Sequence, residues 1–272
     1  MLAIWGGKLM SLFEIKNLSK TYSSGIISRV NTNAVKNVSF ELKEGQLIAL
    51  VGESGSGKST IAKMLLKLEK PSSGEIVLNG QSIFDYDAKD YYKQVQVIFQ
   101  DPYSSINYFY KIDRVLEQAL KLRNAELTTD EKEKLIKEAL SKVGIDADEI
   151  LGRYPHQLSG GQLQRFLIAR ILLIKPKIVI ADEITSMIDA SSRAGILNLL
   201  LDLRDNEGLT VVFITHDIGQ AQYIADDIIV LKEGDLVESG KVNDVLTNPQ
   251  HQYTKELLSC VPSLYTKWDL EN

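Results

Sequence analysis

The sequence predicts an α/β fold with a parallel sheet. Short apolar segments alternate along the chain with segments whose apolar residues recur at helical spacing, as in strands joined by crossover helices. One apolar segment, residues 46–51, runs directly into a glycine-rich turn and then into a helical pattern. With 44% hydrophobic and 25% charged residues among 272, the chain has the composition of a globular protein with a substantial core.

The first half of the chain carries most of the predicted strands. Its first two segments alternate apolar and polar residues, as strands with one buried face do, and a Ser/Gly/Asn-rich loop separates them. In order, the pattern predicts strands at residues 12–18, 34–42 and 46–51, a helix at 58–68, and strands at 75–78 and 95–99.

A charged block at residues 103–154 has helical spacing and few strand signals. Because this block is long for a connection between parallel strands, it is predicted to be an inserted helical subdomain. The α/β pattern then resumes. From the block onward, the pattern predicts helices at 112–122, 130–143, 159–174 and 190–203, and strands at 177–181 and 210–215.

Charge and cysteine content argue against several classes of protein. A formal net charge of −5 argues against a general nucleic-acid binder, which usually has a basic surface. Cys260 is the single cysteine, so neither an internal disulfide nor a cysteine-held metal centre is expected, and a reducing compartment fits best.

No segment has the roughly 20 consecutive apolar residues that span a bilayer. Residues 1–10 are too short and too weakly basic for a secretory signal. They are interpreted as a non-native start before Met10, or alternatively as a segment that touches a membrane. Any other membrane association must come through a partner.

A glycine-rich motif after the strand at 46–51 predicts a phosphate-binding loop. Its glycines let the backbone wrap closely around phosphates, and its N–H groups and the following helix N-terminus face the anion. Lys58 is expected to reach the β- and γ-phosphates, and Ser59 to ligate Mg²⁺. The residues of this loop that are predicted to bind a nucleoside triphosphate are Gly52, Glu53, Ser54, Gly55, Ser56, Gly57, Lys58, Ser59 and Thr60.

The strand at 177–181 ends in two acidic residues, Asp182 and Glu183. Acids at the carboxyl end of a parallel strand lie beside the nucleotide crevice. Asp182 is therefore expected to orient Mg²⁺ through its water shell, and Glu183 to act as the general base that polarises the attacking water.

A second anion-binding helix terminus is predicted before the helix at 159–174. Ser159 is a favourable N-cap, and two glycines after it permit close backbone approach at the positive end of the helix dipole. The motif consists of Leu158, Ser159, Gly160, Gly161 and Gln162.

This LSGGQ motif, set between the two phosphate-site motifs, resembles the signature of the ABC ATPase family, and the resemblance covers residues 12–258. It implies a P-loop NTPase (RecA-like) core with an antiparallel β subdomain and an inserted helical subdomain. The implied division is one ABC ATPase domain at 11–262 (α/β core with β subdomain at 11–100 and 165–240, helical signature subdomain at 101–164), a C-terminal helical extension at 241–272, and a disordered or non-native start at 1–10.

The resemblance assigns roles to further residues. Gln100 resembles the glutamine that touches Mg²⁺ and water, and His216 resembles the switch histidine at the γ-phosphate. Ser186 and Asp189 fall in the D-loop, and Tyr22 resembles the aromatic residue that stacks on adenine. The implied catalytic set is Glu183, His216, Lys58 and Gln100, and the implied metal set is Ser59, Gln100 and Asp182.

Two departures from the family pattern concern residues without charge. Ile184 replaces the usual proline after the glutamate, and Met187-Ile188 replaces the commoner Ala-Leu of the D-loop. Because the acids, lysine, glutamine and histidine are all present, we expect an active ATPase.

The family works as pairs of such subunits, with each ATP held between the phosphate loop of one and the signature of the other. The resemblance therefore implies a second ABC ATPase subunit, two transmembrane permease subunits, an indirectly associated solute-binding protein and no nucleic acid. The second subunit is expected to be a heterologous D-type chain, with a homodimer as the alternative. The location implied is the cytoplasmic face of the cell membrane.

Flanking sequences resemble the dipeptide/oligopeptide/nickel importer branch, and within it the F-type ATPase. They are Tyr-Pro-His-Gln at 154–157, Gln-Leu-Gln-Arg at 162–165 and the tail 248–258, in which Gln252 replaces a common proline. The iron–sulfur centre of many branch members is not expected here, because Cys260 stands alone. Peptides are the favoured cargo, with oligosaccharides or nickel as alternatives. Soluble ABC ATPases of DNA repair or translation are the remote alternative, because they carry long heptad arms or two cassettes, whereas this chain has short helices and one cassette.

Overall fold

The computed structural model describes residues 11–24, 30–123 and 126–259. The predictions made for residues 1–10, for Cys260 and for the last part of the C-terminal extension lie outside these ranges. In the part of the chain that is described, no helix is both long enough and apolar enough to cross a membrane.

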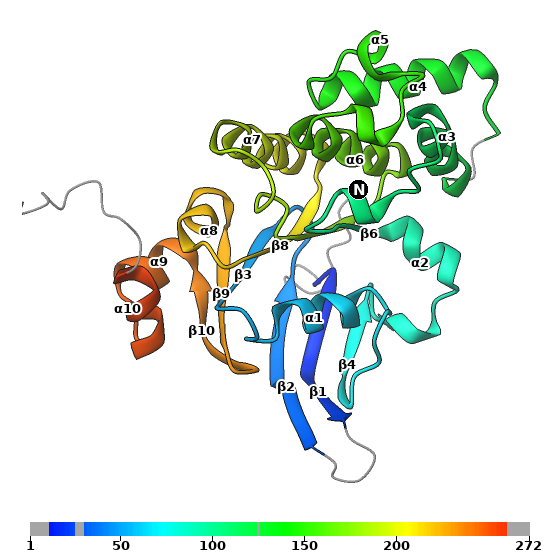
Figure 1. Ribbon diagram of the computed structural model, residues 1–272. Coiled ribbons are helices and arrows are strands. Elements are labelled where there is room, and N and C mark those ends of the chain that lie inside the picture. Colours follow the sequence, from blue (N-terminus) through cyan, green and yellow to red (C-terminus); the bar gives the residue numbers. More distant parts are fainter. Residues whose placement is uncertain (1–10, 25–29, 124–125, 260–272) are drawn as a thin grey trace, which may run out of the picture.

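A six-stranded sheet with the strand order β10-β9-β3-β8-β7-β6 forms the centre of the molecule (Figure 1). The five strands from β9 to β6 pair in parallel, and the edge strand β10 is antiparallel to β9. The strands are β3 (Leu47–Val51), β6 (Val95–Ile98), β7 (Ile178–Asp182), β8 (Thr210–Thr215), β9 (Asp227–Lys232) and β10 (Asp235–Lys241).

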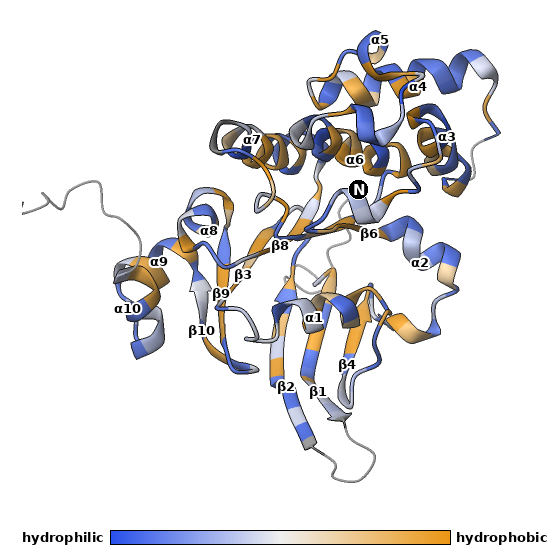
Figure 2. Cartoon of the chain, viewed as in Figure 1, coloured by the Kyte–Doolittle hydropathy of each residue, from blue (hydrophilic) through white to orange (hydrophobic). Residues whose placement is uncertain are grey.

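Both faces of this sheet are covered, which explains why β3 and β8 consist of consecutive buried residues. Alternate residues of each strand enter different cores: Ala49 packs with the helices of one face, and Leu50 packs with the elements of the other. The α/β prediction is confirmed, and Figure 2 shows the apolar strands of this sheet beside strands of the second sheet that alternate in hydropathy.

The second sheet is antiparallel and has the order β2-β1-β4-β5. Together with α1 it covers one face of the central sheet (Figure 1). Strands β1 and β2 are longer than the predicted segments, because the two strands remain paired beyond the residues that alternate between apolar and polar. The elements are β1 (Phe13–Ser24), β2 (Val30–Leu42), α1 (Lys58–Leu65), β4 (Ser73–Leu78), β5 (Gln81–Ser82) and, leading to β6, α2 (Ala88–Gln94).

Helices lie on the opposite side of the central sheet, where α6 contacts β6 while α3 and α4 pack on α6 (Figure 1). They are α3 (Ile112–Leu122), α4 (Thr129–Lys142), α5 (Ala147–Ile150), α6 (Gly160–Ile174) and α7 (Ala190–Glu207). The first four lie between β6 and β7 in the chain, where the sequence predicts a helical insertion. Helix α6 continues past residue 164, the expected end of that subdomain, because its apolar residues pack against the sheet.

The segment after β8 completes the molecule with α8 (Ile218–Ile224), the β9–β10 hairpin, α9 (Val242–Thr247) and α10 (Gln252–Ser259). The two strands of this hairpin are not among the strands predicted from the sequence. Their signal is a short apolar run followed by a Glu-Gly turn in which Glu233 (φ 49°) and Gly234 (φ 89°) both have positive φ.

Candidate active site

Four neighbouring parallel strands end at one edge of the central sheet, and a predicted site residue follows each of them. Gly52 follows β3, Gln100 lies two residues after β6, Glu183 follows β7 and His216 follows β8. This edge is where α/β sheets bind ligands, because loops and helix N-termini meet there.

The phosphate loop lies between β3 and α1, and neighbouring backbone leaves no room for side chains at two of its glycines. A Cβ atom on Gly57, which has φ of 104°, would lie 2.4 Å from the carbonyl oxygen of Ala34. A Cβ atom on Gly52 would lie 2.2 Å from the carbonyl oxygen of Leu231. The loop therefore passes directly against β2 and β9, and this approach requires glycine.

Lys58 is buried at the start of α1 and points back into the loop. Its ammonium group donates hydrogen bonds to the carbonyl oxygens of Gly52 (2.6 Å) and Glu53 (2.8 Å). Burial lowers the pKa of Lys58, while the charges of Glu183 and Asp182 act in the opposite direction. The loop thus holds a cation close to the two acids of β7.

The other residues of the loop divide between buried and exposed positions. Ser56 is buried, and its carbonyl oxygen accepts a hydrogen bond from Gly234 N–H (3.1 Å). Thr60 is half-buried. The exposed members are Glu53, Ser54, Gly55 and Ser59.

The two acids at the end of β7 differ in environment. Burial raises the pKa of Asp182 to about 6, with the charge of Glu183 adding to the effect and Lys58 opposing it. Glu183 has φ of 47°, a conformation that is unfavourable for a residue with a side chain. Its N–H group donates to Ile214 (2.9 Å) and its carbonyl oxygen accepts from the N–H (3.0 Å) and hydroxyl (2.8 Å) of Ser186. These bonds fix the strained residue and its side chain.

One carboxylate oxygen of Glu183 is the meeting point of two predicted residues. Gln100 donates to Oε2 from Nε2 at 3.1 Å, and His216 Nδ1 lies 3.4 Å from the same atom. His216 is exposed, whereas the Glu183 side chain is only 20% exposed. A carboxylate held in this way can accept a proton from a water molecule at the open side of the site.

The donor set fits Mg²⁺ better than other metals. Among the described residues there is no cluster of three or more His, Cys, Asp or Glu side chains that would form a protein-only metal site. Mg²⁺ instead binds through one or two protein oxygens, waters and phosphates of the substrate. Ser59, Asp182 and Gln100 provide oxygen donors of this kind around the loop and the strand ends.

The LSGGQ segment is built as a helix start on the other face of the sheet. Ser159 and Gln162 form a reciprocal capping box, in which Ser159 Oγ accepts from Gln162 N–H (3.2 Å) and Gln162 Oε1 accepts from Ser159 N–H (3.0 Å). Leu158 is buried beneath them. The signature glycines, Gly160 and Gly161, lie beside the D-loop and the first turn of α7, so a Cβ on Gly161 would lie 3.2 Å from Ser192 Oγ.

The D-loop joins the acids of β7 to α7. Asp189 caps α7 by accepting from Ser192 N–H at 2.9 Å. Ile184 and Ile188 are buried and Met187 is 59% exposed. Of the three residues in these two departures, Ile184 and Ile188 therefore add apolar groups to the core, and Met187 projects to the surface.

Tyr22 lies on β1 in register with Thr32 of β2. Lys20, on the same strand, pairs with Val35, which borders Gly57 of the phosphate loop. The ammonium group of Lys20 lies 5.0 Å from the centre of the Tyr22 ring. Tyr22 therefore lies on the four-stranded sheet. Its partner Thr32 is close along β2 to Ala34 and Val35, the residues that the phosphate loop approaches at Gly57.

Tyr253 is a residue at this site that sequence reasoning missed. Its hydroxyl oxygen accepts a hydrogen bond from Glu53 N–H at 2.9 Å, although the two residues are 200 positions apart. Only its place in the branch-typical tail distinguished it in the sequence.

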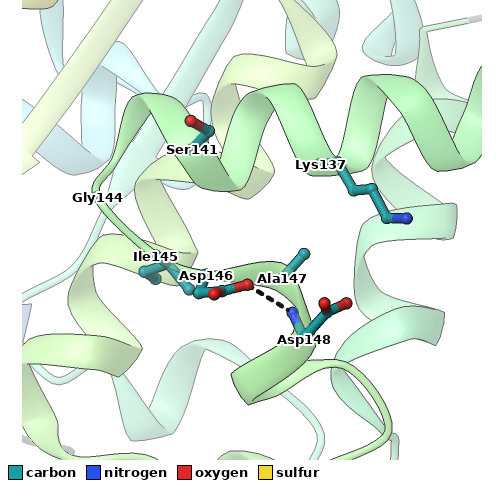
Figure 3. Close-up of a pocket in the computed structure, with 7 residues that line it drawn as sticks. All are labelled: Lys137, Ser141, Gly144, Ile145, Asp146, Ala147 and Asp148. Carbon is teal, nitrogen blue, oxygen red and sulfur yellow. Dashed lines mark hydrogen bonds between the residues drawn. The ribbon is translucent and has the colours of Figure 1, made fainter.

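A separate surface hollow lies between α4 and α5 of the helical insertion (Figure 3). Asp146 borders it and caps α5 by accepting from Asp148 N–H (3.0 Å). Its lining contains no predicted site residue. The lining residues are Lys137, Ser141, Gly144, Ile145, Asp146, Ala147 and Asp148.

Two family models and several known proteins match the chain. The model of the ABC transporter family matches residues 35–186, and that of the oligopeptide/dipeptide transporter C-terminal region matches residues 237–272. The dipeptide transport ATP-binding protein DppF of Haemophilus influenzae is 43% identical, over 85% of this chain and 71% of that protein. The putrescine export system ATP-binding protein SapF of Escherichia coli is 39% identical, over 92% and 93%. A dimeric ATP-binding cassette solved with ADP and Pi superposes with a TM-score of 0.75 at 31% identity, over 85% and 98%.

Proposed function

The chain belongs to the ABC transporter family, and from this premise we propose that it is the ATP-hydrolysing subunit of a membrane importer for peptides. The observation that carries the hydrolytic part is the convergence of Gln100 and His216 on one carboxylate oxygen of Glu183, beside the buried Lys58. The match of residues 237–272 to the C-terminal region of oligopeptide/dipeptide transporters supports the peptide part.

In the proposed reaction the triphosphate lies in the loop at residues 52–60, and Lys58 turns from its two carbonyl partners towards the β- and γ-phosphates. Ser59, Gln100 and Asp182, the last through a water molecule, would hold Mg²⁺, which would supply positive charge against the phosphates. Glu183 takes a proton from the attacking water. Gln100 and His216 orient that carboxylate, and Tyr22 stacks on the adenine.

We further propose that the signature acts on the nucleotide of a second ATPase subunit. The phosphate loop and α1 lie on one face of the central sheet, whereas α6 lies on the other, so the two anion-binding helix starts are directed to different nucleotides. The similar solved cassette is dimeric, which supports the presence of a second ATPase subunit. The partner is a heterologous D-type chain in the assembled importer.

Substitution of Ser159 with aspartate is expected to lower ATP hydrolysis in the assembled transporter by roughly 100-fold. Aspartate is as good an N-cap as serine, so α6 keeps its start, but the added charge repels the γ-phosphate of the partner's nucleotide. Ser159→Asn keeps the cap without the charge and is the matched control, with a much smaller expected loss. Hydrolysis is measured in vesicles. Equal activity of the two variants would exclude the trans contact.

The segment between β6 and α3 is the proposed contact with the permease subunits. Phe109 is 88% exposed, and it borders a hollow formed with the first turns of α3. Tyr110 and Arg114 stack beside it, with the guanidinium 3.8 Å from the ring centre. A large exposed apolar residue beside a hollow marks an interaction site for a partner segment.

Phe109→Asp is expected to abolish co-purification with the permeases and to leave ATP binding by the free subunit unchanged, because Phe109 lies outside the strand-end site. Leu68→Asp is the matched control, since Leu68 is also exposed (56%) but lies after α1 on the other side of the sheet. Retained assembly of the Phe109 variant would contradict the proposed contact.

The relatives differ in the cargo that their names give, since DppF is named for dipeptide transport and SapF for putrescine export. Uptake of labelled di- and oligopeptides, putrescine, oligosaccharides and Ni²⁺ by cells with and without the gene distinguishes these classes. Loss of peptide uptake alone, restored by the wild-type gene and not by Glu183→Gln, is the expected result. The subunit is proposed to act at the cytoplasmic face, attached through the permeases and supplied by a solute-binding protein.

A further inference from the structure

The C-terminal region reaches the phosphate loop through a single hydroxyl group. Tyr253, in the first turn of α10, is only 3% exposed, and its hydroxyl oxygen accepts the N–H of Glu53 at 2.9 Å. Glu53 is the second residue of the loop. No other described hydrogen bond joins α10 to this loop.

The surroundings of Tyr253 hold its ring in a fixed position. The ammonium group of Lys232, at the end of β9, lies 4.7 Å from the ring centre. The carboxylate of Glu238 on β10 accepts the N–H groups of Gln250 (2.8 Å) and His251 (3.1 Å), which fixes the start of α10. Tyr253 N–H in turn donates to His251 Nδ1 at 3.1 Å. These contacts hold the Tyr253 hydroxyl in position against the phosphate loop.

The peptide units of Glu53 are held from two sides. Tyr253 binds its N–H group, while its carbonyl oxygen accepts from Lys58 Nζ (2.8 Å) and from Ser56 N–H (3.2 Å). When Lys58 turns to a bound triphosphate, the carbonyl loses its strongest donor, because bonds from charged groups are the stronger ones. The bond from Tyr253 then becomes more important for the conformation of the start of the loop.

We propose that Tyr253 is a positioning residue of the nucleotide site, whose hydroxyl fixes Glu53 and thereby pre-forms the phosphate loop for ATP. This inference rests on the proposed role of that loop in ATP binding. It makes the C-terminal region a part of the nucleotide site in addition to any role that region has in assembly.

Tyr253→Phe is the direct test, because it removes the hydroxyl and keeps the ring. Loss of one hydrogen bond to a positioned backbone group predicts ATP affinity weaker by about threefold to tenfold, with kcat at saturating ATP changed by less than about twofold. Amide hydrogen exchange at Glu53 is expected to accelerate in the nucleotide-free protein. ATP affinity is measured by titration calorimetry, and KM and kcat by phosphate release.

Tyr86→Phe is the matched control, since the Tyr86 hydroxyl donates to Leu78 carbonyl oxygen at 2.9 Å on the four-stranded sheet, away from the loop. It is expected to lower the melting temperature without changing ATP affinity. Glu238→Ala, which loosens the start of α10 and keeps the hydroxyl, is expected to weaken ATP binding in the same direction as Tyr253→Phe. Unchanged ATP affinity in Tyr253→Phe, with normal binding by wild type, overturns the inference alone. Failure of the wild-type protein to bind ATP overturns the proposed function itself.

Discussion

Replacement of Glu183 by glutamine is expected to lower the rate of ATP hydrolysis by about 1,000-fold, which is within the range that a positioned general base contributes. Glutamine has the same shape but cannot accept a proton from water. The left-handed backbone at residue 183, the bond that its N–H donates to Ile214 and the bonds that its carbonyl oxygen accepts from Ser186 do not depend on the carboxylate, so the fold of the strand end is retained.

The same variant is expected to bind ATP with unchanged or higher affinity and to accumulate as an ATP-bound dimer. Binding precedes proton transfer, and a neutral side chain no longer repels the γ-phosphate. Phosphate release gives the rate, and light scattering with and without ATP gives the dimer. Glu44→Gln, which neutralises an exposed carboxylate in the turn before β3, is the control and is expected to hydrolyse ATP normally. Turnover near the wild-type rate in Glu183→Gln would mean that another group, with His216 the first candidate, accepts the proton.

The sequence predicts the fold and the edge at which the site lies because two kinds of signal are local. Periodicity separates strands such as 210–215 from helices such as 112–122, and both match the structure. Residues that directly follow parallel strands must lie at one edge, so the proximity of Gly52, Glu183 and His216 follows from the order of motifs alone.

Other features of the site depend on tertiary packing and have no local signal. The positive φ of Glu183 is imposed by the hydrogen bonds of Ile214 and Ser186 and occurs at a residue type that does not favour it. The bond between Tyr253 and Glu53 joins residues 200 positions apart, and β9 and β10 become strands by pairing with β3 and with each other. Such contacts form through packing in the folded protein, and the local strand propensity of the residues does not predict them.

Substitution of Lys58 with alanine is the second change with a large expected effect, and ATP affinity is expected to fall by about 100-fold. Hydrogen bonds from a charged donor contribute about 1.5–3 kcal/mol each, and Lys58 is the buried cation of the loop. Because the ammonium group is partly desolvated before ATP arrives, its attraction to phosphate is stronger than that of an exposed lysine.

Two further variants distinguish charge from geometry at this position. Lys63→Ala removes an exposed positive charge one turn further along α1 and is expected to change ATP affinity by less than about twofold. Lys58→Arg keeps the charge, but the wider planar guanidinium does not fit between the carbonyl oxygens of Gly52 and Glu53, so binding is expected to remain weak. Calorimetric titration with ATP and Mg²⁺ measures all three. If the arginine variant binds as wild type does, net charge alone accounts for the role of Lys58. If it binds as weakly as the alanine variant while Lys63→Ala is normal, the enclosed position of the ammonium group is what the loop requires.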